Sequence, residues 1–195
     1  IRLANFIAST SANTGVLMLV DFLWWNSGLS LTLTTSQTVN SVTWPARDDN
    51  ELSDGTGVYI GLFITTGTGA GTPNLTLTYT NQAGTAGRTA NLIQATAASS
   101  ALGTFYQFAL QAGDTGVRSV QSYQASATWT SGVVHLVAYR ILATLDILSS
   151  GQPEALNLLT GGAPKVWNAT CPNLLYIPAT TTTTSIYGSV TWTQA

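Results

Sequence analysis

The amino-acid sequence predicts an all-β fold, an antiparallel β-sandwich of jelly-roll-like arrangement with an extended N-terminal arm. Short runs of alternating apolar and polar residues recur between clusters of turn residues. No long stretch shows the period of an amphipathic helix. Hydrophobic residues make up 45% of the 195 residues, enough for one domain with its own core. We therefore expect residues 1–15 to form the arm and residues 16–195 to form a single sandwich domain.

The elements before residue 110 follow from local patterns. Residues 2–14 mix Leu, Phe and Ile with Ser, Thr and Asn, which indicates an arm or an edge strand. Residues 16–25 are apolar all round, as in a buried strand or one short buried helix. Alternation and flanking turn residues then predict four strands, at 29–35, 58–65, 74–80 and 88–96, and residues 104–110 lead into the next element.

The stretch from 110 to 142 is expected to organise the fold as a hairpin. Residues 111–116 are rich in turn residues, a strand runs over 117–129, and Ser131-Gly132 offers a tight turn into a second strand over 133–142. Both faces of the second strand are largely apolar, which predicts cover by a second sheet and by a partner chain. Beyond it, 154–159 forms one helical turn or a long loop, and 174–177 and 185–193 are closing strands.

The composition excludes several classes of partner. Charged residues make up only 7% of the chain, and its net charge is -2, whereas an ordinary soluble domain is roughly 25% charged. Six scattered basic residues do not form the stripe that nucleic-acid binding needs. No apolar run approaches the length of a membrane helix, and the first residues lack the basic and apolar regions of a signal peptide, so we expect none. We expect neither nucleic acid nor membrane as a partner.

The sequence offers no catalytic constellation, so we predict a protein that is not an enzyme and binds no cofactor. His135 lies between apolar residues in a predicted strand, as structural histidines do. The single cysteine, Cys171, is predicted to be a small buried hydrophobe. No nucleophile elbow or zinc motif is present, and the glycine-rich stretch 67–71 precedes a strand and not the helix that a phosphate loop requires.

One loop gathers acidic residues. Oxygen ligands for calcium could come from this loop, although its spacing is not that of an EF-hand, and the alternative is an ordinary solvated loop. The candidate ligands are Asp48, Asp49, Glu51 and Asp54.

Aromatic and apolar residues supply the candidate contacts. The adjacent tryptophans Trp24 and Trp25 indicate a large contact, either in the core or with a neighbouring subunit. Aromatic side chains could also stack on sugar rings, so a glycan-binding module is the alternative. The predicted interface residues are Ile1, Leu3, Phe6, Trp24, Trp25 and Tyr139.

Four strings of sequence resemble a family of tailed-bacteriophage virion structural proteins, over about residues 19–143. They are Trp-Pro-Ala-Arg-Asp at 44–48, Gly-Val-Tyr-Ile at 57–60, Tyr-Thr-Asn-Gln-Ala-Gly at 79–84, and the segment 110–122, Leu-Gln-Ala-Gly-Asp-Thr-Gly-Val-Arg-Ser-Val-Gln-Ser.

The resemblance implies a small all-β protein built into the virion, most plausibly a capsid decoration or cement protein, with no catalytic residues to assign. Its expected partners are the major capsid protein or other virion subunits. Symmetric self-association, as a trimer, is also expected. The alternative is a glycan-binding fibre or adhesin-type sandwich module.

Overall fold

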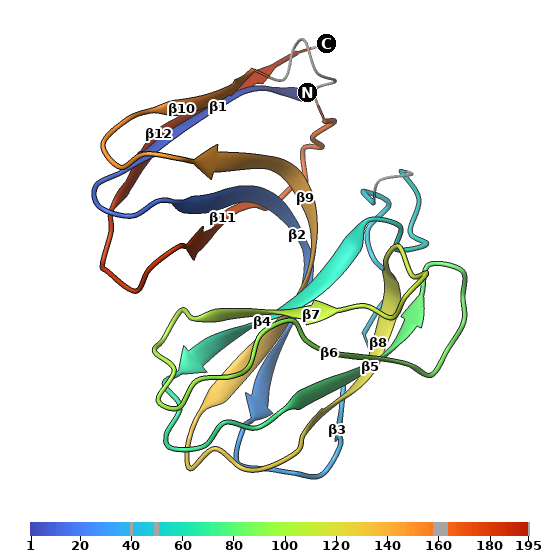
Figure 1. Ribbon diagram of the computed structural model, residues 1–195. Helices are drawn as coiled ribbons and strands as arrows, with labels where there is room; N and C mark the ends of the chain where they lie inside the picture. The colour runs from blue at the N-terminus through green and yellow to red at the C-terminus, as the bar shows by residue number, and fades with distance from the viewer. Residues whose placement is uncertain (40, 49–50, 158–163, 195) are drawn as a thin grey trace. The chain divides into compact units, whose positions relative to one another are not determined.

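The computed structural model describes residues 1–39, 41–48, 51–157 and 164–194. Its secondary structure is entirely β, and the strand pairings are antiparallel, which confirms the predicted fold class. The twelve strands are drawn in Figure 1. They are β1 (Arg2–Thr10), β2 (Gly15–Ser30), β3 (Gln37–Thr38), β4 (Val58–Thr66), β5 (Leu75–Asn81), β6 (Arg88–Leu92), β7 (Phe105–Ala109), β8 (Val117–Ala125), β9 (Val133–Ile147), β10 (Glu154–Asn157), β11 (Pro172–Pro178) and β12 (Ile186–Thr193).

The chain divides into two compact units, where the sequence predicted one domain. Unit 1 comprises residues 1–21 and 141–195, and unit 2 comprises residues 22–140. Strands β2 and β9 are long enough to contribute residues to both units. Unit 2 is therefore an insertion between the two sequence segments that build unit 1.

Unit 1 contains the sheet β10-β1-β12 and the outer part of a nine-stranded sheet, in which β11 pairs with β2. Residues 2–10, expected to be part of an arm, instead form the central strand of the smaller sheet. Leu3, Phe6 and Ala8 are buried with Leu17 and Leu19 of β2. The arm prediction was wrong because the short polar residues of this segment hid its apolar inward face.

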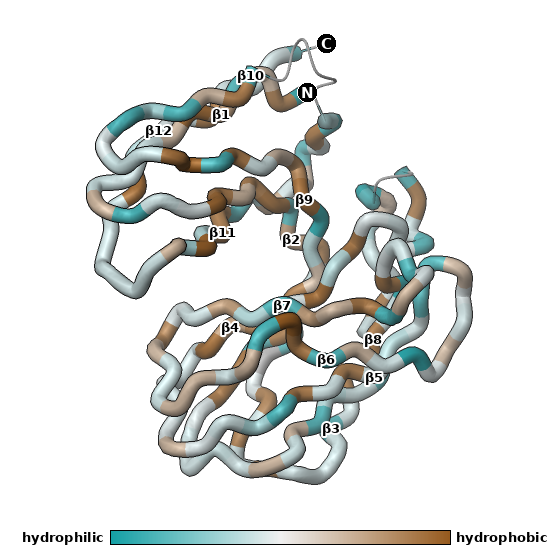
Figure 2. Tube along the Cα trace, viewed as in Figure 1, coloured by the Kyte–Doolittle hydropathy of each residue, from teal (hydrophilic) through white to brown (hydrophobic). Residues whose placement is uncertain are grey.

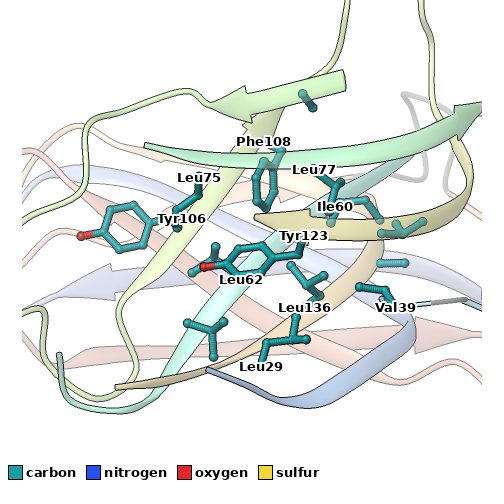
Figure 3. Packing of buried hydrophobic residues seen from close by; sticks show 14 of the residues in the cluster. Leu29, Val39, Ile60, Leu62, Leu75, Leu77, Tyr106, Phe108, Tyr123 and Leu136 are labelled. Carbon is teal, nitrogen blue, oxygen red and sulfur yellow. The ribbon is translucent and has the colours of Figure 1, made fainter. Parts of the chain in front are cut away.

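Unit 2 holds the remaining strands of the larger sheet, whose order is β11-β2-β9-β4-β7-β6-β5-β8-β3. Strand β7 joins two layers, since residues 105–107 pair with β4 while Phe108 and Ala109 pair with β6. Figure 3 shows Leu62 and Leu136 of one layer packed with Leu77 and Tyr123 of the other. This packing makes unit 2 a sandwich, while its jelly-roll connectivity stays a prediction.

The predicted hairpin at 117–142 does not form. Strand β8 pairs with β5 and β3, whereas β9 pairs with β4. The connection between β8 and β9 crosses from one layer to the other, and it carries the fully buried Trp129, whose backbone N–H donates to the Leu31 carbonyl (3.1 Å). Burial of this indole outweighed the local turn signal of Ser131-Gly132. The inward alternation of Val134, Leu136 and Ala138 is confirmed.

The other predicted strands are found with shifted ends. Residues 16–25 belong to a strand and not to a helix, but β2 continues to Ser30 in place of the separate strand predicted at 29–35. Strand β6 stops at Leu92, and residues 154–157 form a strand where a helical turn or loop was expected.

The outer face of β4 carries a row of aromatic contacts that depends on a glycine. The Phe105 ring lies 4.9 Å from the Phe63 ring and 5.7 Å from the Tyr139 ring, between ring centroids. A Cβ on Gly61 would lie 2.1 Å from the Phe105 ring. Only glycine lets this ring lie against the strand.

We expect Gly61→Ala to destabilise unit 2 by about 1–3 kcal/mol, because the Phe105 ring must leave its aromatic neighbours. Urea unfolding followed by tryptophan fluorescence measures the effect. Gly67→Ala is the matched control, since its nearest neighbour, the Ser100 carbonyl oxygen, is 3.7 Å away. Equal unfolding midpoints for the two variants would contradict this packing role.

Candidate functional site

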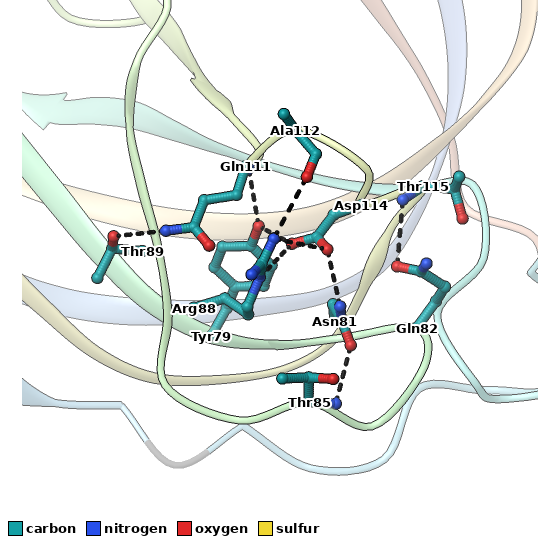
Figure 4. Close-up of polar contacts among 10 residues, drawn as sticks. All are labelled: Tyr79, Asn81, Gln82, Thr85, Arg88, Thr89, Gln111, Ala112, Asp114 and Thr115. Carbon is teal, nitrogen blue, oxygen red and sulfur yellow. Dashed lines mark hydrogen bonds and ion pairs between the residues drawn. The ribbon is translucent and has the colours of Figure 1, made fainter.

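The four strings that carry the resemblance lie together at one end of unit 2. The turn at 111–116 packs against the end of β5 and the turn that follows it, as Figure 4 shows. Thr115 donates its N–H to the Gln82 side chain (3.1 Å), and Gln82 donates its own N–H to the Gly116 carbonyl (3.1 Å). Segments distant in sequence are thus joined by backbone and amide hydrogen bonds.

The Asp114 carboxylate is the centre of this loop cluster. It accepts hydrogen bonds from the Tyr79 hydroxyl (2.5 Å), from the Asn81 amide (2.7 Å) and from the Arg88 guanidinium (2.9 and 3.1 Å) (Figure 4). Its side chain is 3% exposed, and that of Arg88 is 28% exposed. The bidentate contact with Arg88 fixes both carboxylate oxygens.

These contacts and the burial of the cluster shift the pKa values of Asp114, Tyr79 and Arg88. Burial of the Asp114 carboxyl raises its pKa, but the hydrogen bonds from Arg88, Tyr79 and Asn81 outweigh that effect, so the net pKa lies below the ordinary value. Burial, followed by the bond to Asp114, raises the pKa of Tyr79. The bond to Asp114 raises the pKa of Arg88. The cluster therefore holds a stable carboxylate whose hydrogen-bonding capacity is used by its own neighbours.

The acidic loop is joined to the same cluster by hydrogen bonds from residues on either side of it. Gly57 donates its N–H to the Thr115 carbonyl (3.0 Å), and Trp44 donates its indole N–H to the Val117 carbonyl. Asp48 is fully buried, and its two carboxylate oxygens accept the N–H groups of Leu52 (2.7 Å) and Gly55 (3.0 Å). Burial raises the pKa of Asp48, the two backbone bonds lower it, Asp54 raises it, and the net shift is upward.

Backbone hydrogen bonds of the loop use carboxylate oxygens of two of the candidate calcium ligands. The Asp48 oxygens serve the loop backbone, and Asp54 accepts the N–H of Thr56 (2.9 Å). Glu51 is exposed, and Asp49 lies outside the described residues. No group of three or more His, Cys, Asp or Glu side chains arranged to hold a metal occurs among the residues that the structure describes. The loop is exposed at Glu51 and Leu52, whereas Arg47 and Asp48 are buried.

An open depression of about 450 Å³ lies beside the cluster. Thr80, Gly84, Arg118 and Ser119 belong to strings that carry the resemblance, but sequence reasoning assigned no lining residue to a site, because the side chains come together only through strand pairing. It is lined by Ser41, Thr43, Ser53, Thr80, Gly84, Arg118 and Ser119.

A second candidate surface is the open edge of unit 1. Strand β12 pairs with β1 on one side only, and its residues carry no charge. Ile186 and Val190 lie opposite the buried Thr10 and Phe6, so they share the inward face of the sheet. Ile186 is nevertheless 37% exposed, and Tyr187 on the other face is 62% exposed. Both faces of β12 are therefore open at this edge.

The neighbouring edge of the other sheet is also apolar. Leu174 of β11 lies opposite the buried Leu19 yet is 51% exposed, and Ile177 is 47% exposed. Strands β11 and β12 are joined only by the loop 179–185, so their edges lie on the same side of unit 1 (Figure 1). Figure 2 shows that strongly hydrophilic residues are confined to short stretches of the chain. We call β12 the open edge, and β11 is its apolar neighbour.

The predicted interface residues have different environments. Ile1 is 47% exposed and Trp25 is 64% exposed, so both are available for contacts. Leu3 and Phe6 lie in the core of unit 1. Trp24 packs against Trp44, with ring centroids 5.4 Å apart.

Tyr139, which was expected at an interface, is fully buried. Its ring contacts the rings of Tyr59 (6.0 Å) and Phe105 (5.7 Å) within unit 2, and burial raises the pKa of its hydroxyl. The second face of β9 is thus covered at this point by side chains of its own unit.

His135 belongs to unit 2 and Cys171 to unit 1. His135 lies opposite Phe63 in β4, and its imidazole forms no hydrogen bond with any described residue. Cys171 is exposed, and its backbone N–H donates to Asp21 (2.9 Å), so the prediction that it is buried was wrong.

Comparison with models of known protein families, with curated proteins and with solved structures found no match to the chain. Within the described part of the chain, no helix has the length and apolar character needed to cross a membrane.

We expect Asp114→Asn to destabilise unit 2 by about 2 kcal/mol at pH 7, because the variant loses charge-assisted hydrogen bonds. The lowered pKa of Asp114 means that its contribution is complete above the unfolded pKa of about 3.9 and is lost as pH falls towards the folded pKa. The difference in unfolding midpoint between variant and wild type should then close below about pH 4.

Asp146→Asn is the matched control, since Asp146 is exposed on β9. Its unfolding midpoint should equal that of the wild type at pH 7. A difference between Asp114→Asn and wild type that stays constant down to pH 2 would contradict the ionic role of Asp114.

Proposed function

We propose that the chain is a non-enzymatic structural protein of a bacteriophage virion, a capsid decoration or cement protein that bridges neighbouring capsid subunits. The observation that carries the proposal is the uncharged open edge of unit 1, where β12 exposes backbone groups and apolar side chains together. The resemblance of the four strings to virion structural proteins supports it.

The contrast among strand edges favours an assembly role. Soluble proteins protect sheet edges with short strands, charges or prolines. Strand β3 has only two residues, β10 is short and begins at Glu154, and β11 has a proline at each end. Among the described edges, β12 has eight residues and none of these protections. An unprotected edge of this length is suited to permanent cover by a partner.

The low charge of the chain supports the same function. With 7% charged residues, copies of the protein repel one another weakly when they are packed at high density. Many weak apolar contacts, repeated over a symmetric shell, add up through multivalency. The expected trimer would supply part of this valency and stays a prediction.

The direct test is cofractionation with virions. Particles of the phage that encodes the chain are banded in a density gradient and probed with an antibody against the protein. We expect the protein in the particle band at a constant ratio to the coat protein. Its absence from banded particles, with the protein recovered free, would overturn the proposal.

We expect Tyr187→Lys to reduce the amount of particle-bound protein about tenfold or more, because a lysine ammonium in a covered edge would be desolvated without a partner. The side chain is 62% exposed in the free protein, so the fold should tolerate the change. Leu102→Lys in unit 2, at a position 73% exposed, adds the same charge away from the edge and should bind as the wild type does. Equal loading of both variants would remove β12 from the interface.

Exposed aromatic residues favour one second function, a glycan-binding fibre or adhesin module. Trp25 is 64% exposed and could stack on a sugar ring. A sugar array distinguishes the two functions, because a cement protein should bind no neutral sugar through Trp25, whereas an adhesin should lose binding in Trp25→Ala.

A further inference from the structure

We propose that the depression at Arg118 is a binding site for an acidic saccharide, with the Arg118 guanidinium holding its carboxylate, sulfate or phosphate group. This inference is independent of the proposed virion role, since it concerns only residues of unit 2.

The first support is that strand pairing places Arg118 in a bulge. In the ladder between β5 and β8, Thr80 lies opposite Ser119 and Asn81 lies opposite Val117, so Arg118 is an extra residue without a partner across the ladder. Bulges redirect a side chain away from the regular alternation, and they are frequent at functional sites. Here the redirected side chain lines the depression.

The second support is that the positive charge of Arg118 is uncompensated. Among the described residues, none forms a hydrogen bond or ion pair with the Arg118 side chain. The carboxylates nearby in the fold have other partners: Asp114 binds Arg88, and Asp48 and Asp54 accept backbone N–H groups. A free guanidinium presents a planar fork of donors that matches an oxyanion.

The third support is the space over the turn at 81–84. Gly84 has φ +82°, and a Cβ there would lie 3.3 Å from a terminal nitrogen of Arg118. Glycine therefore serves the turn and also leaves room for the guanidinium.

The rest of the lining indicates that the oxyanion is carried by a sugar. Five hydroxyl side chains surround Arg118, and a hydroxyl both donates and accepts, as sugar hydroxyls do. Ser41 is held in place by the backbone of Val120, with bonds of 3.0 and 2.7 Å. Thr43 and Ser53 form no hydrogen bond with other described residues, so their hydroxyls are free for a ligand. A volume of about 450 Å³ exceeds what one carboxylate side chain of a peptide would fill.

The test is a titration of the full chain followed by two-dimensional NMR. The probes are glucuronate, glucose 6-sulfate and glucose 6-phosphate, with neutral glucose, inorganic phosphate and an oligo-aspartate peptide as comparisons. We expect the acidic sugars to shift the amide signals of Ser41, Thr80 and Ser119 and to bind at least tenfold more tightly than the three comparisons. The three acidic sugars identify which oxyanion is preferred.

Arg118→Gln should weaken binding of the acidic sugars at least tenfold, and Thr43→Val should weaken it by a smaller factor without a change in charge. Lys165→Gln is the charge-matched control, since Lys165 belongs to unit 1, and it should bind as the wild type does. Unchanged binding in Arg118→Gln would overturn the site. Equal or tighter binding of inorganic phosphate or of the peptide would overturn the assignment to a saccharide.

Discussion

The hydrogen bonds that converge on the Asp114 carboxylate are the constraint on which the functional end of unit 2 depends. They join the turn at 111–116 to β5 and to Arg88 of β6. The backbone of the same turn also accepts a hydrogen bond from Gly57, at the end of the acidic loop. With the start of β8 fixed in this way, its ladder with β5 accommodates two register shifts. One of them leaves Arg118 beside the depression, so the binding site that we propose is a consequence of the structural cluster.

Alternation in the sequence predicted the strands whose side chains meet the core at every second position. Leu75, Leu77 and Tyr79 of β5 are all fully buried, as the pattern indicated. The pairing of the strands was harder to predict from the sequence, because it depends on the burial of residues against others that are distant in the sequence. The indole of Trp129 directs the chain across to the other layer, and no local signal competes with the apparent tight turn beside it. The prediction of an N-terminal arm was wrong for a similar reason, because Phe6 is buried through pairing with β12, which is distant in the sequence.

The candidate site, like the fold, could be predicted from the sequence only in part. The four strings were recognisable as sequence, and the structure explains them as parts of one loop cluster that satisfies its own polar groups. Arg118 lies in one of these strings, but neither it nor Arg88 was predicted to be a site residue, because ion pairing and a bulge are properties of register and not of composition. The exposure of Tyr187 was equally hidden, since its strand is predicted as readily in a core as at an edge.

Strand β1 is synthesised before the insertion at 22–140, whereas its ladder partner β12 is synthesised after it. Contacts of such wide sequence separation form slowly, because a long loop must close before they contribute. During synthesis the insertion at 22–140 can fold first, while Leu3 and Phe6 lack most of their final cover. The nascent chain therefore passes through a stage in which β1 is a target for chaperones or for another copy, and production at high level should favour strand-exchanged oligomers joined through β1.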